Sequence, residues 1–209
     1  MITKRLLART AILANLLAAI LFASPALAQD SSTPAPPQTE PPAQRTLSAA
    51  EVQDNLATVS PLSIIYVITE YWTGGDKLKA AFWYYIWQIR TQAWVGSDSG
   101  FDQFRTTMNN EMGSTINGWI GADPVVWREV AERAASYEAK LPLWRVHPEN
   151  MTEEAWLAQI AATRADYAKQ MTDAFDSTTP DAMRASRTAA NLPVGPLTDS
   201  GAPLPEEWQ

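Results

Sequence analysis

Residues 76–95 (DKLKAAFWYYIWQIRTQAWV) constrain the fold more than any other part of the chain, because they are apolar around most of a helical circumference. One helical face carries Leu78, Phe82, Tyr85, Ile86, Ile89 and Ala93. A second stripe, roughly 120° round the helix, carries Trp83, Trp87, Arg90 and Trp94. Only Lys77, Tyr84, Gln88 and Thr91 are left to face water. A helix that is apolar on two sides needs partners on both, so we expect a central helix surrounded by others.

Capping residues and prolines divide the rest of the chain into further helices. Ser48 and Glu51 form a capping box, and cap–proline pairs mark other helix starts. With the spacing of apolar residues, these signals predict helices over 48–58, 60–72, 101–120, 123–140, 152–175 and, shorter, 179–190. The only β-rich run, 64–68, lacks alternation and a second strand to pair with. We therefore predict an all-α protein: a compact bundle of about five to six helices with a tryptophan-rich core and disordered ends.

The N-terminal residues 1–28 have the organisation of a secretory signal peptide. Basic residues at the start are followed by an apolar run over 11–22 and by the small-x-small site Ala26-Leu27-Ala28. The alternative is a retained membrane anchor, for which the apolar run is short. The sequence thus predicts a periplasmic or secreted protein with no membrane span once the signal is removed.

Three segments are expected after the signal peptide. Residues 29–46 are rich in Pro, Ser and Thr and predict a disordered linker. Residues 47–176 are expected to form the helical domain. Residues 177–209 are expected to hold a short helix and a Pro-rich tail, and the tail has no apolar period. We therefore expect 191–209 to be dispensable for folding.

Charge and cysteine content exclude several classes of function. The formal charge is −7, and removing residues 1–28 takes away three basic and no acidic residues, which leaves −10. Nucleic acid and anionic membranes reward positive charge, so neither is an expected partner, whereas a basic protein is. The chain has no cysteine, which rules out disulfides, thiolate nucleophiles and Cys-ligated zinc. No cofactor or metal is predicted.

Residues 75–85 (GDKLKAAFWYY) resemble the junction in tetratricopeptide or Sel1-like repeats. In those repeats a Gly-Asp turn leads into a helix that begins with Ala, Trp and Tyr. The resemblance covers one hairpin and occurs once, because stepping on by the repeat period brings Trp83 to Asn117. It implies an antiparallel helical hairpin at this point of the chain.

Few residues have the context that catalysis needs. The lone His147 lies in a loop with no partner motif nearby, so a structural or solvent role is expected for it. Glycoside hydrolysis needs two carboxylates across a sugar site, and Glu70 and Glu111 are the best candidates for that pair. Both are otherwise explained as solvated or capping residues. Asp98 and Asp102 bracket a polar loop without the ligand pattern of a calcium site.

The second stripe of the central helix has two interpretations. Trp83, Trp87, Arg90 and Trp94 can form another packing face, with Arg90 stacked on indole rings or paired to an acid. They can instead form an exposed aromatic groove for a helix, a peptide or a glycan. These four are the candidate binding residues.

The function predicted from these features is non-enzymatic: binding another protein or peptide in the cell envelope. One specific form is an immunity-type inhibitor of an envelope-acting toxin, since such proteins are small, acidic and exported. Two alternatives remain open. One is a cell-wall glycan-cleaving enzyme that uses Glu70 or Glu111, and the other is a structural accessory subunit of an envelope assembly.

Overall fold

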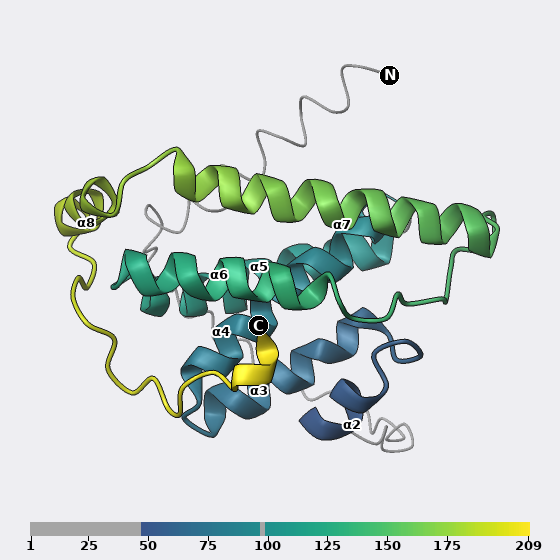
Figure 1. The fold of residues 1–209 in the computed structure, drawn as a ribbon, viewed down its shortest axis with the longest axis horizontal. Coiled ribbons are helices and arrows are strands. Elements are labelled where there is room, and N and C mark those ends of the chain that lie inside the picture. The colour runs from purple at the N-terminus through teal and green to yellow at the C-terminus, as the bar shows by residue number, and fades with distance from the viewer. Residues whose placement is uncertain (1–46, 97–98) are drawn as a thin grey trace, which may run out of the picture.

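The computed structural model describes residues 47–96 and 99–209, and this part of the chain is a compact all-α bundle without strands (Figure 1). The α-helices are α2 (Ala49–Asp54), α3 (Ile64–Thr73), α4 (Lys77–Thr91), α5 (Ser99–Ile120), α6 (Pro124–Glu138), α7 (Glu153–Asp176) and α8 (Pro180–Ala189). Short 3₁₀ turns are η1 (Pro61–Ser63), η2 (Gln92–Trp94) and η3 (Glu206–Trp208). The all-α prediction is confirmed, whereas the expected signal peptide and linker lie outside the described residues.

The predicted central helix is α4, which packs against α3, α5, α6 and α7. Each of its residues from Ala80 to Thr91 is buried. The expectation that one strip of this helix meets water is wrong for Tyr84, Gln88 and Thr91. Polar side chains of α5 and α7 hydrogen-bond to that strip and cover it, so α4 is enclosed on its polar side too.

Helices α2, α6 and α7 begin at capped residues, where the predicted ranges 48–58, 123–140 and 152–175 also begin. Ser48 and Glu51 form the capping box of α2, and the side chains of Asp123 and Thr152 accept hydrogen bonds from the first turns of α6 and α7. Asp76 is different, because its side chain makes no cap bond to α4. Its carboxylate instead accepts hydrogen bonds from Lys79 Nζ and from the backbone N–H of Ala202, and these bonds lower its pKa.

The C-terminal tail has a defined place on the bundle, which differs from the expectation of a disordered end. It runs from α8 back across the bundle and ends between α3 and α6 (Figure 1). Trp208 is 7% exposed and stacks on Phe82 with ring centroids 5.0 Å apart. Arg133 donates hydrogen bonds to the carbonyls of Trp208 and Pro205. A Pro-rich segment has no helical period, so nothing in its pattern indicated that its tryptophan packs in the core.

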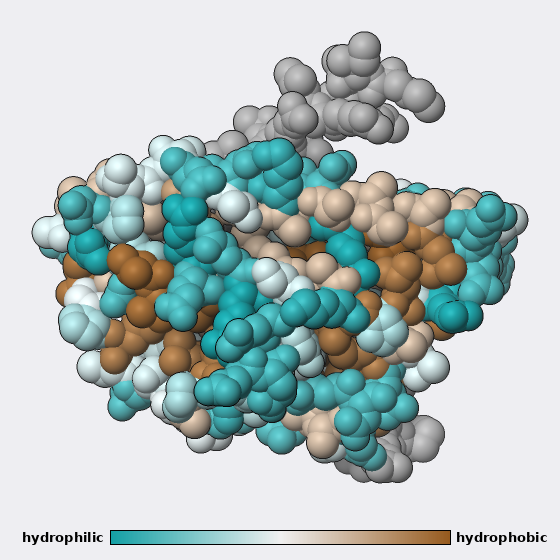
Figure 2. All heavy atoms as spheres, in the orientation of Figure 1, coloured by the Kyte–Doolittle hydropathy of each residue, from teal (hydrophilic) through white to brown (hydrophobic). Residues whose placement is uncertain are grey.

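The apolar interior consists of a main core around α4 and a smaller second cluster. The second cluster contains Ala93, Trp144, Trp156 and Ile160, with Trp94, Leu143 and Met151 packed against it. Figure 2 shows apolar patches at more than one place on this face of the molecule. In the second cluster Ala93, Trp144 and Ile160 are 5–9% exposed, whereas Trp156 is fully buried.

Candidate functional site

A buried polar network joins α4 to α5 and α7. Gln88 donates a hydrogen bond to the hydroxyl of Tyr84 (2.6 Å), and that hydroxyl donates to Asn109 Oδ1 (2.8 Å). Tyr167 and Arg105 both donate to Gln88 Oε1, at 3.2 Å and 3.0 Å. Burial raises the pKa of Tyr84 and of Tyr167, so both stay neutral donors at neutral pH. Because these polar groups bond to one another, the network holds α4 against α5 and α7.

Gly113 leaves the space that the Tyr84 hydroxyl occupies. A Cβ built on Gly113 would lie 2.5 Å from that oxygen, which is closer than packed atoms approach. Gly113 and Gly118 both lie in the interior of α5, and close helix approach explains the first of them. Gly118 has no heavy atom within 4 Å of such a Cβ.

These two glycines form a matched pair for a stability test. We expect Gly113→Ala to destabilise the protein by about 1–3 kcal/mol, because the ring of Tyr84 is enclosed and cannot move aside freely. Gly118→Ala is expected to stabilise it by up to about 1 kcal/mol, since alanine is the better helix former and meets no neighbour. Urea unfolding of both variants measures the difference, and effects of the same sign would contradict this account.

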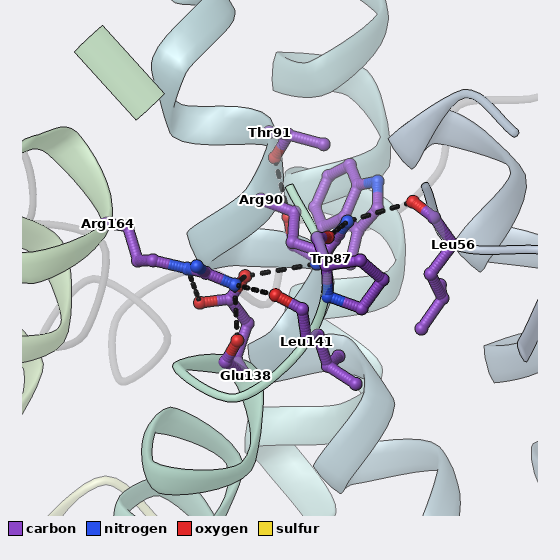
Figure 3. A network of polar contacts seen from close by, with 8 residues as sticks. Leu56, Trp87, Arg90, Thr91, Glu138, Leu141 and Arg164 are labelled. Carbon is purple, nitrogen blue, oxygen red and sulfur yellow. Dashed lines mark hydrogen bonds and ion pairs between the residues drawn. The ribbon is translucent and has the colours of Figure 1, made fainter. Parts of the chain in front are cut away.

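The ion cluster Arg90–Glu138–Arg164 connects α4, α6 and α7 (Figure 3). Glu138 lies 3.3 Å from Arg90 Nη1 and 2.6 Å from Arg164 Nε, and its side chain is 3% exposed. Arg90 also donates to the carbonyls of Leu56 (3.0 Å) and Pro142 (2.8 Å). Burial lowers the pKa of Arg90, and the charge of Glu138 opposes that effect. The cluster carries two positive charges and one negative charge.

A pocket opens beside this cluster, between α4, η2, α7 and the connection that follows α6. It is a shallow depression of about 280 Å³ when the open solvent at its mouth is included, with room inside for about one water molecule. We call it the Trp94 pocket, and it is lined by Pro61, Ile89, Arg90, Trp94, Glu138, Leu143, Trp144, Trp156, Ile160 and Arg164. The second apolar cluster thus forms one part of its wall and the ion cluster another.

The four candidate binding residues divide between the core and this pocket. Trp83 and Trp87 are fully buried in the main core, so they form the packing face that was one of the two interpretations, and they line no exposed groove. Arg90 is paired to an acid, Glu138. Trp94 is half-buried, and its ring lies 4.8 Å from Trp156 and 5.0 Å from Trp144 between centroids. Only Arg90 and Trp94 reach the pocket.

The two candidate carboxylates have separate surroundings. Glu70 is exposed on α3 and accepts a hydrogen bond from the backbone N–H of Ala49 (2.8 Å), so it supports the start of α2. Glu111 is exposed on α5. His147 is half-buried in the connection before α7, with its Nδ1 3.0 Å from the carbonyl of Pro148.

Sequence reasoning missed Glu138, Arg164, Trp144 and Trp156 as residues of one site. The sequence does contain a pattern that could have identified Glu138 and Arg164 as buried. Glu138 follows Trp127, Ala131 and Ala134 on the buried face of α6, and Arg164 follows Trp156 and Ile160 on that of α7. A charge on an otherwise apolar face indicates a buried partner of opposite sign. Which helices share that partner depends on packing, which the pattern does not encode.

Within residues 47–96 and 99–209, no group of three or more His, Asp or Glu side chains is arranged to hold a metal ion. No helix in that part of the chain is both long enough and apolar enough to cross a bilayer. Comparisons with known protein families, with curated proteins and with solved structures find no match to this chain.

Proposed function

We propose that this is an exported protein that binds another protein or peptide in the cell envelope, and that the Trp94 pocket is the place of contact. The observation that carries the proposal is the composition of the pocket. It combines aromatic side chains with arginine, and these residue types dominate the energetics of protein interfaces. The expectation of export comes from the signal-like residues 1–28 alone.

The surroundings of the pocket also favour a macromolecular partner. Val95, directly after Trp94, is 47% exposed. An exposed apolar side chain beside a pocket extends the area that a partner can cover. The interior of the pocket has room for only about one water molecule, so it does not hold a drug-sized ligand. A partner would therefore contact the surface around the pocket rather than fill it.

Site-specific photo-crosslinking in the cell envelope of the native host tests this proposal. A photoreactive phenylalanine is placed at Val95 and, as a matched control, at Val125 on α6, which is 52% exposed. We expect a discrete crosslinked product from position 95, identified by mass spectrometry, and none from position 125. The purified partner should then bind the wild-type protein at least about tenfold more tightly than the Trp94→Ala variant, because hot-spot tryptophans contribute 2 kcal/mol or more. Equal crosslinking at both positions would contradict the proposal.

A further inference from the structure

Residues 198–209, which we call the strap, run across the bundle and include the 3₁₀ turn η3 (Figure 1). Trp208 is the only buried residue of this segment. A segment with so few buried contacts opens at a lower free energy than the helices beneath it. The strap is held at two places, one at the start of α4 and the other beside α6.

The first attachment supplies a cap that α4 lacks. Because a helix leaves its first N–H groups without intrahelical acceptors, the N–H of Leu78 needs a partner from outside α4. That partner is the carbonyl of Ser200 in the strap, at 3.0 Å. Asp76, whose side chain makes no cap bond to α4, accepts a hydrogen bond from the N–H of Ala202 (3.0 Å). The strap therefore completes the start of the central helix.

Gly201 fixes the position of this attachment. Its φ is 75°, in the left-handed region that favours glycine. A Cβ built on it would lie 2.5 Å from Asp76 Cα and 2.6 Å from the carbonyl oxygen of Gly75. These are backbone atoms, which cannot turn aside as the end of a side chain can. The strap therefore lies this close to the turn between α3 and α4 only with glycine at position 201.

The second attachment joins η3 to α6. Arg133 Nε donates a hydrogen bond to the carbonyl of Trp208 (3.0 Å), and Arg133 Nη2 donates to that of Pro205. Pro203 and Pro205 lie between the two attachments. Proline restricts the backbone and keeps a segment extended. A shift at one attachment is therefore transmitted along the strap to the other.

We propose that the strap opens and closes as one unit over a bundle that stays folded. Its release removes the cap of α4 and exposes the aromatic rings that Trp208 covers. Those rings belong to Phe82, Trp83 and Tyr137, which contact the indole in the closed form. The strap is then a conformational switch, which controls both the order of the first turn of α4 and the exposure of an aromatic surface. It does not depend on the binding function proposed for the Trp94 pocket.

Native-state hydrogen exchange of the isolated protein tests this proposal. The N–H groups of Leu78 and Ala202 report the first attachment, and the N–H of Trp208, bonded to the carbonyl of Pro205 in the closed strap, reports the second. We expect all three to have the same protection factor, at least about tenfold lower than that of Ile160 within α7, which reports global unfolding. Their exchange should depend little on urea, because opening the strap exposes little surface.

Two variants disturb one attachment each. Gly201→Ala acts on the first, and Trp208→Phe, which keeps an aromatic ring so that the bundle still folds, acts on the second. Each should raise the exchange rates of all three N–H groups by a common factor of about tenfold or more. Gly96→Ala is the matched control, because Gly96 also has a positive φ of 82° but has no heavy atom within 4 Å of a built Cβ. This control should leave the three rates unchanged.

The proposal is overturned if the three N–H groups of the wild type differ in protection, or if they exchange as slowly as that of Ile160. The second result would mean that the strap opens only on global unfolding. Faster exchange at Leu78 but not at Trp208 in the Gly201→Ala variant would also overturn it, because the two attachments would then be independent. None of these outcomes involves the Trp94 pocket, so failure here is distinct from failure of the crosslinking experiment.

Discussion

Replacing Trp208 with alanine is expected to lower the free energy of unfolding by about 3–5 kcal/mol, the usual cost of truncating a buried tryptophan. The indole packs against Phe82, Trp83 and Tyr137, so its removal opens a cavity lined by aromatic rings. Urea unfolding monitored by circular dichroism measures the loss. Glu206→Ala, an exposed change in the same 3₁₀ turn, is the control and should leave the unfolding midpoint unchanged.

The burial of Trp208 also predicts which fragment should survive limited proteolysis. We expect the stable fragment to retain Trp208, rather than to end near the last residues of α8. A protease-resistant fragment without the tail, or a loss below about 1 kcal/mol for Trp208→Ala, would show that the tail is dispensable, as its composition suggests.

Replacing Glu138 with alanine is expected to destabilise the protein by about 3–5 kcal/mol, because it leaves two largely buried arginines without their shared counter-ion. The side chains of Arg90 and Arg164 are 4% and 15% exposed, so water cannot replace the lost carboxylate. Glu138→Gln should be nearly as harmful, since an amide keeps the volume but brings N–H donors toward guanidinium groups. Urea melts of both variants separate the effect of charge from that of size.

Glu132 provides the matched control on the same helix. It pairs with Arg128 on the surface of α6, where both side chains are well exposed. Exposed pairs contribute little to stability, so Glu132→Ala should leave the unfolding midpoint near that of the wild type. A Glu138 variant that behaves like the Glu132 variant would show that the ion cluster is not needed for folding.

Much of the helical bundle could be predicted from the sequence, because the residues that start and pattern its helices lie close together along the chain. The caps at Ser48, Asp123 and Thr152 depend on residues within one turn, and the apolar circumference of α4 indicated that it would be enclosed. The covering of Tyr84 and Gln88 was not predictable in this way. Their partners come from α5 and α7, and a polar strip that bonds to other helices has the same sequence pattern as one that faces water.

The candidate site was predictable only in part for the same reason. The second stripe of the predicted central helix identified Arg90 on α4 and Trp94 on η2, but also Trp83 and Trp87, which lie in the main core. The pocket is completed by Trp144 from an irregular connection and by Arg164 from α7. No local pattern joins these residues, because they meet only when the connection after α6 folds back beside η2. A helical wheel shows which residues share a face of one helix, but the residues of this site come from several elements that the wheel does not relate.

The position of Trp208 has a consequence for the order of events during synthesis. The main core includes Ala49, near the beginning of the described chain, and Trp208, near its end. Domains fold as units during synthesis once their residues have emerged from the ribosome. Here the aromatic core around α4 lacks one of its rings until Trp208 has been made. This core therefore reaches its full native packing only once residues 49–208 have all been synthesised, and until then it is less stable.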